Sequence, residues 1–230
     1  MPVEPDDAPG LRVELDHARA AIEALRRDLR EQRREAQHRV RNVLAMVRSI
    51  ARRTIDEGET AETYQALLDG RLASFARVQG LILRSPTAGV DLDTLVAGEL
   101  LAYGIRLGAG ARVAGDAVVL TATAAGVLGL AFHELTRMTI EGALTTASRG
   151  GGIDVRWDRN DDSGGSASLV IDWRDTALRS AIAPASISTF GHEILEQAVA
   201  YELNGTARLE VADGGLTCRF FIPYDCVMPR

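Results

Sequence analysis

One histidine, His38, lies in the middle of an arginine-rich segment at residues 35–54, EAQHRVRNVLAMVRSIARRT. An unperturbed imidazole is largely neutral near neutral pH, so a ring nitrogen can act as a nucleophile. Asn42 follows one helical turn later and could orient the ring or a phosphoryl group. Arg39 and Arg41 flank the histidine and could hold a phosphoryl group or an acidic partner. This spacing permits a phosphoryl-carrying histidine, and it also permits a solvated histidine on a helix surface.

The composition is that of an ordinary globular chain. Of the 230 residues, 46% are hydrophobic and 25% are charged, and no apolar run reaches the roughly 18 residues that a membrane span needs. The N-terminal stretch MPVEPDDAPG resembles neither a signal peptide nor a transit peptide. Cys218 and Cys226 lack metal-ligand partners at suitable spacing and suit unpaired thiols in a reducing compartment. We therefore expect a cytoplasmic protein that does not bind a membrane and holds no metal.

The net charge of −6 conceals a basic segment. Ten arginines lie between Arg26 and Arg53, where the only acidic residues are Asp28, Glu31 and Glu35. Such a basic face can be a solvated coiled-coil surface, or it can attract an acidic partner. Aromatic residues make up 5% of the chain and do not alternate with these arginines, so there is no stacking platform for nucleic acid. We do not expect nucleic acid as a partner.

Apolar residues at steps of three and four form a helical seam from Leu11 to Ile50. Two successive four-residue steps interrupt it between Gln32 and Val40, and His38 lies off the seam at this irregularity. The seam predicts a long helix over 11–56 that pairs with another helix.

A second helix is expected after Gly58 and ends at the turn-forming RSPTAG of residues 84–89. Two helices cannot bury their apolar faces alone, whereas two copies can do so as an antiparallel four-helix bundle. We therefore expect a homodimer through residues 35–84. The predicted organisation is a disordered tail at 1–10, a coiled-coil extension at 11–34, a helical hairpin at 35–86 and a third region at 90–230.

The pattern changes from Val90 onward. Helical stretches around residues 91–104, 122–144 and 188–203 alternate with strand-like segments, and Asn204-Gly205 gives a helix-stop signal. These segments predict an α/β sandwich, with helices on one face of a mixed sheet. The fold class is therefore α+β, in which a long helical hairpin that forms a dimeric four-helix bundle precedes the sandwich.

Several segments resemble the core of the HWE-type histidine kinases. HRVRNVLAMVRSIARRT, which begins at His38, is similar to their phosphoacceptor box, and LLDGRLASFARVQGLIL is similar to their second dimerisation helix, with Gln79 where a histidine is usual. AFHELTRMTIEGAL, which contains His133, is similar to their N-box. WRD at residues 173–175 is similar to their Trp-x-Glu element, and FGHEILEQAVAYELNGTARLEV is similar to the end of their ATP-binding domain. The resemblance covers about residues 35–223 and implies that His38 is the phosphoacceptor.

The ATP-binding part departs from this family pattern. Met138 stands where the N-box asparagine would hold Mg²⁺, and a thioether is a poor ligand for that cation. TALRSA at residues 176–181 replaces a Gly-Gly-Pro run, and Thr189 replaces the first glycine of the second glycine box. Phosphoryl transfer from ATP depends on positioning and on metal neutralisation of charge. We therefore expect no cofactor, and structural roles for His133 and Glu134.

The predicted function is that of a histidine phosphotransferase without ATP, which relays phosphoryl groups between receiver-domain aspartates through His38. The expected partners are response-regulator receiver domains and an upstream sensor kinase or hybrid receiver, with Arg39, Arg41 and Asn42 at the contact. Three alternatives are an active soluble HWE-type histidine kinase, a non-catalytic dimeric scaffold that binds a response regulator, and a nucleic-acid-binding coiled-coil dimer.

Overall fold

The computed structural model describes residues 8–55, 60–84, 88–146, 152–161, 167–175, 189–212 and 215–228. Its backbone groups into two compact units, Met1–Ser49 and Ile50–Arg230. None of the described helices has an apolar stretch long enough to cross a bilayer.

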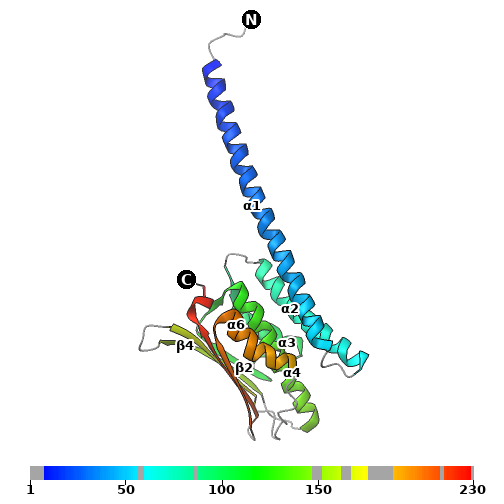
Figure 1. The fold of residues 1–230 in the computed structure, drawn as a ribbon. Coiled ribbons are helices and arrows are strands. Elements are labelled where there is room, and N and C mark those ends of the chain that lie inside the picture. Colours follow the sequence, from blue (N-terminus) through cyan, green and yellow to red (C-terminus); the bar gives the residue numbers. More distant parts are fainter. Residues whose placement is uncertain are drawn as a thin grey trace. The chain divides into compact units, whose positions relative to one another are not determined.

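Helix α1 runs from Ala8 to Ile55 (Figure 1); its residues up to Ser49 belong to the first unit, and Ile50–Ile55 belong to the second. Its bounds lie close to those that the seam predicts. Several large apolar side chains of the seam are exposed in the single chain, namely Leu15, Ile22, Leu25 and Leu29. These residues are free to pack against another helix.

The second unit begins with the end of α1 and helix α2, Ala61–Arg84. One face of α2 is buried and consists of Arg71, Ser74, Phe75 and Val78. This face lies against helix α4, Ala122–Thr146, and the approach is close because α4 presents Gly129 beneath Val78. Helix α2 is therefore part of the same packed unit as the sandwich.

A five-stranded sheet forms the other layer, in the order β2-β4-β5-β7-β6. Strand β2 pairs with β4 in parallel, and the other neighbours are antiparallel. Helices α3, α4 and α6 cover one face (Figure 1), so the predicted combination of helices with a mixed sheet is confirmed.

The remaining bounds are β1 Val90–Asp91, α3 Leu92–Ala102, β2 Ala111–Gly115, β3 Val119–Leu120, β4 Ile153–Asp161, β5 Ala167–Asp175, α5 Thr189–His192, the π-helical turn Glu193–Ala198, α6 Val199–Leu203, β6 Thr206–Ala212, β7 Gly215–Pro223 and the 3₁₀ turn Tyr224–Cys226.

The core lies between the sheet and helix α4. Every second residue of β5 is buried, from Leu169 to Trp173, as expected for a strand with one covered face. Phe132 of α4 stacks on Trp173 at 5.9 Å between ring centroids and meets Phe220 of β7 edge-on at 5.9 Å. These aromatic contacts fix α4 on the sheet.

The predicted helix stop at Asn204-Gly205 is confirmed. Asn204 adopts a left-handed conformation with φ of 50°, which asparagine tolerates better than most residues. Gly205 follows, and a Cβ at this position would come within 2.7 Å of the Phe221 carbonyl oxygen. The chain can therefore turn directly from α6 into strand β6.

Replacing Gly129 by alanine should destabilise the second unit. The new Cβ would lie 2.5 Å from Val78 Cγ2, and such overpacking costs about 1–3 kcal/mol. Gly126→Ala is the matched control, because it lies on the same helix with nothing within 4 Å of its added Cβ, and it should be neutral or stabilising by up to about 1 kcal/mol. Urea unfolding of both variants measures the difference, and equal stabilities would show that α2 does not pack closely on α4.

Candidate functional site

His38 lies on α1 with an exposed side chain. Asn42 is also exposed one turn later, and residues four apart share a helix face. The imidazole makes no hydrogen bond or ion pair with any part of the chain that the structure describes. In the single chain the His38 side chain is therefore open to a partner molecule.

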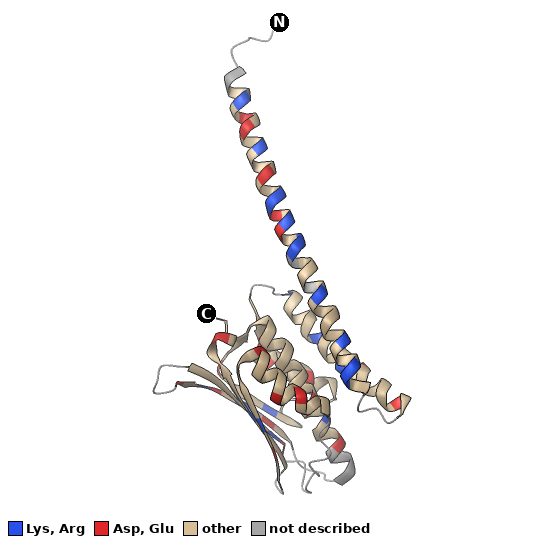
Figure 2. Cartoon of the chain, viewed as in Figure 1, with Lys and Arg blue, Asp and Glu red and all other residues tan. Residues whose placement is uncertain are grey.

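Arginines accompany His38 along this helix, which Figure 2 shows as a series of blue bands. Arg34 and Arg41, one turn before and about one turn after His38, are both exposed. Arg41 Nε donates to the carbonyl oxygen of Gln37 at 3.3 Å, which places its guanidinium beside the turn that carries His38. The Arg39 side chain lies outside the described residues.

The segment that resembles an N-box is a buried part of α4. His133, Glu134 and Met138 have only 2%, 0% and 4% of their surface exposed. The Met138 thioether packs in this interior instead of offering an oxygen to a cation, and no cluster of metal-ligating side chains occurs among the described residues. Met138 therefore supplies no hard ligand for a magnesium ion in this segment.

A buried arginine from α2 binds the carboxylate of Glu134. Arg71 Nε donates to Glu134 Oε1 at 2.8 Å and Arg71 Nη2 to Oε2 at 3.4 Å, with both side chains fully buried. Arg137, one turn further along α4, also donates to Glu134 Oε2 at 2.9 Å. Two guanidinium groups thus bind the carboxylate; the structural role predicted for Glu134 is compatible with these contacts and stays a prediction.

A second network joins α2 to α3 and α4. Arg77 binds the buried carboxylate of Glu99 with both arms of its guanidinium, at 3.2 Å and 2.7 Å. Nδ1 of His133 lies 3.6 Å from the same carboxylate, and its Nε2 lies 3.4 Å from the Tyr103 hydroxyl. His133 is therefore packed inside a polar cluster, which agrees with the structural role predicted for it.

The charges in these networks shift the pKa values of their acids. Burial by itself raises the pKa of Glu134, but Arg137 and Arg71 outweigh this effect and hold it below the usual range. In Glu99 the effect of burial is likewise outweighed, by His133 and Arg77, and the pKa is again lowered. Burial and the charge of Glu134 raise the pKa of Tyr103 to about 12. Near neutral pH both carboxyl groups are therefore ionised in the folded protein, and the Tyr103 phenol keeps its proton.

The structure describes only part of the two other segments that resemble nucleotide-binding elements, residues 173–181 and 189–191. Asp175 at the end of β5 is buried, with 1% exposed. TALRSA at 176–181 lies outside the described residues. Thr189 begins α5, and Gly191 is buried on that helix.

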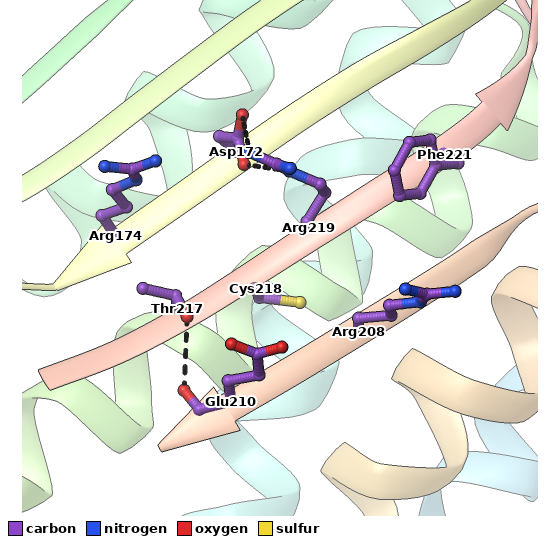
Figure 3. Close-up of a pocket in the computed structure, with 8 residues that line it drawn as sticks. All are labelled: Asp172, Arg174, Arg208, Glu210, Thr217, Cys218, Arg219 and Phe221. Carbon is purple, nitrogen blue, oxygen red and sulfur yellow. Dashed lines mark hydrogen bonds and ion pairs between the residues drawn. The ribbon is translucent and has the colours of Figure 1, made fainter. Parts of the chain in front are cut away.

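A shallow hollow of about 360 Å³ lies on the sheet face away from the helices (Figure 3). Arg219 binds Asp172 in it at 2.6 Å and 3.1 Å, and Thr217 donates to the Glu210 carbonyl oxygen at 3.5 Å. Three arginines and two acidic residues line the hollow, and Arg219 lies opposite Asp172 on one neighbouring strand and opposite Arg208 on the other. The hollow has the character of a solvated antiparallel sheet face.

Sequence reasoning missed Arg71 as an organising residue. It stands next to Leu72 on a helix whose apolar stripe is interrupted by charges, and an arginine in a helix is usually exposed. The available signal was its position one turn before Phe75 and two turns before Val78, on the face that proves to be buried.

Comparisons with known proteins agree with the resemblance in the sequence. Residues 35–117 match the family described as HWE histidine kinase. The blue-light-activated histidine kinase of Brucella ovis is 26% identical over 191 residues, which are 83% of this chain and 38% of that protein, and the protein of the same description from Brucella anthropi is 24% identical over the same share. The chain thus spans about two fifths of the length of these relatives.

Among solved structures, the histidine kinase domain of a blue-light activated histidine kinase from Erythrobacter litoralis matches with a TM-score of 0.53 and 18% identity. The match covers 80% of this chain and 84% of that domain. At this identity the likeness concerns the fold. The family match over residues 35–117 agrees with the predicted resemblance to an HWE-type histidine kinase core, and the structural match confirms a sandwich that resembles a kinase ATP-binding domain.

Replacing Glu134 by glutamine should destabilise the second unit strongly. The amide leaves Arg71 buried without its counter-charge, and breaking one partner of a buried ion pair costs about 3–5 kcal/mol. Glu141→Gln is the matched control on the same helix: its carboxylate also binds Arg137 but is 53% exposed, so the loss should stay below about 1 kcal/mol. Urea unfolding measures both, and a small loss for Glu134→Gln would contradict the buried network.

Acid should weaken the same networks. Because the folded state lowers the pKa of Glu134 and Glu99, their contribution is present above the unfolded glutamate pKa of about 4.3. It is lost as the pH falls through the lower folded pKa values. The free energy of unfolding should therefore decline below about pH 4.3, and less steeply in Glu134→Gln. A pH series of urea unfolding curves tests this, and identical slopes in both proteins would contradict it.

Proposed function

We propose, for a chain whose residues 35–117 match the HWE histidine kinases, that it takes up a phosphoryl group on His38 and passes it to the aspartate of a response-regulator receiver domain. The observation that carries the proposal is the exposed imidazole within the matched segment. The protein would act in the cytoplasm, as part of a two-component signalling pathway.

Each transfer exchanges one bond to phosphorus for another. When a receiver is the donor, a nitrogen of His38 attacks the phosphorus of an aspartyl phosphate, the P–N bond forms, the P–O bond breaks and the aspartate leaves as a carboxylate. The reverse reaction loads the next receiver. Because acyl phosphates and phosphohistidines both store transfer energy, alignment of the two groups is the main requirement.

Arg39, Arg41 and Asn42 are proposed to contact the receiver. The acceptor aspartate of a receiver lies in an acidic pocket, so the arginines would steer the encounter and stabilise the phosphoryl oxygens. Asn42 could orient the ring or the phosphoryl group from the next turn. A homodimer is proposed as the acting form, because the exposed apolar seam of α1 suits a second copy.

The named relatives favour ATP as the source of the phosphoryl group. The curated relatives from Brucella are described as histidine kinases, and the comparisons alone support an ATP-dependent kinase better than a relay protein. An active HWE-type kinase is therefore the second candidate. In that case the phosphoryl group of bound nucleotide would reach His38 directly.

The described N-box residues favour an aspartyl phosphate as the source instead. Met138 offers no oxygen to a magnesium ion, and the Glu134 carboxylate is held by Arg71 and Arg137. These two environments support the proposal that neither side chain acts on a nucleotide. We therefore propose relay between receiver aspartates as the function of this chain, without use of ATP.

One experiment separates the two candidates. Purified protein is incubated with radiolabelled Mg-ATP and, in parallel, with a panel of receiver domains phosphorylated by labelled acetyl phosphate. We expect acid-labile, base-stable label from a receiver and none from ATP. Label from Mg-ATP would establish the kinase instead.

His38→Ala should abolish the label while leaving the fold intact. The side chain is exposed and lies off the seam, so its removal opens no cavity and should change the free energy of unfolding by at most about 0.5 kcal/mol. His17→Ala is the control, because His17 is also exposed on α1 and should keep full labelling. A variant without His38 that still relays phosphate would refute the proposal.

A further inference from the structure

The last turn of α1 is anchored within the second unit, although most of this helix belongs to the first. Ile50 and Thr54 have 1% and 0% of their surface exposed. Arg53 binds Glu193 of the π-helical turn at 2.6 Å. The helix that carries His38 therefore ends in a buried and chemically specific attachment.

Arg71 is the centre of this attachment. Its Nη1 donates to Thr54 Oγ1 at 2.9 Å, while its Nε and Nη2 bind the Glu134 carboxylate. Its guanidinium carbon also lies 3.9 Å from the centre of the Phe190 ring. One side chain of α2 thus contacts the end of α1, the N-box segment of α4 and helix α5.

We propose that Arg71 is a positioning residue, which couples the last turn of the phosphoacceptor helix to the N-box helix through Thr54 and Glu134. This coupling rests on the proposed function for its role in phosphoryl transfer, whereas its structural part stands on the contacts alone. A change in the packing of α2 on α4 would then displace the last turn of α1, and the helix would carry this displacement toward His38. His38 precedes Thr54 by sixteen residues, or about 24 Å of helix.

The chemistry of the contact requires arginine. A planar guanidinium can bind a carboxylate with two donors, direct a third toward a hydroxyl and stack on an aromatic ring, all at once. A lysine ammonium at this position would keep the charge but could not satisfy the three directions together. Because Arg71 and Glu134 are fully buried, each movement of α2 away from α4 would separate two charges that are paired in the interior. The attachment therefore has one favoured geometry.

Thr54 provides the most selective test. Its hydroxyl donates to the Ile50 carbonyl oxygen at 2.7 Å and accepts the bond from Arg71. Thr136 is its match: it is equally buried and donates to the Phe132 carbonyl oxygen at 2.7 Å. Valine at either position removes the local bond and keeps the shape, but only Thr54→Val removes a contact with Arg71.

Hydrogen–deuterium exchange of the full chain measures the coupling directly. In Thr54→Val we expect the amides of residues 50–55 to exchange about tenfold faster or more, as loss of a hydrogen bond to a charged group predicts. Thr136→Val should leave these amides unchanged. Arg71→Lys should reproduce the effect of Thr54→Val, and circular dichroism confirms that each variant is folded. Equal exchange in Thr54→Val and Thr136→Val would overturn the proposal.

A kinetic measurement tests the consequence for transfer. With a receiver that labels the wild-type protein, Thr54→Val should lower the saturating transfer rate and leave the half-saturating receiver concentration unchanged, because the surface around His38 is intact. An unchanged saturating rate in Thr54→Val would overturn the positioning role. If no receiver labels the wild type, the proposed function fails while the exchange experiment still decides the coupling.

Discussion

The ion pair between Arg71 and Glu134 is the interaction on which the arrangement of the second unit depends. Both groups are fully buried, 63 positions apart in the sequence. A buried charge is tolerated when its partner and hydrogen bonds are in place, so the pair imposes a single register between α2 and α4. Gly129 permits the close approach, and further along α2 the partly exposed Arg77 binds the buried Glu99 of α3. Apolar contacts drive the packing, and the charges specify its geometry.

This constraint also bears on the chemistry available to the N-box segment. A carboxylate that activates phosphoryl transfer needs access to the reacting group, whereas the Glu134 carboxylate accepts hydrogen bonds from Arg71 and Arg137. Met138 adds packing and no hard ligand. The segment keeps the helix and its place on the sheet, so the sandwich retains the overall likeness to a kinase domain. A likeness of fold to kinase domains is therefore compatible with the methionine and the paired carboxylate that this segment carries.

Much of this could be read from the sequence because it depends on local patterns. The seam of α1, the strand alternation of β4 and β5 and the stop at Asn204 are each determined by neighbours in the chain. The partners of Arg71 could not be read in this way: helical periodicity reports which residues are apolar, not which distant carboxylate makes burial of a charge tolerable. The π-helical turn at Glu193–Ala198 escaped for a similar reason, since its apolar pattern also fits an ordinary helix.

The two halves of the proposed mechanism make opposite physical demands. A nucleophilic imidazole must be open to a second protein, and His38 meets this on a helix that exposes most of its side chains. A buried ion pair must exclude water, and Arg71 with Glu134 meets this in the interior. Helix α1 carries the exposed His38 and, in its last turn, Thr54, which is buried and bound to Arg71.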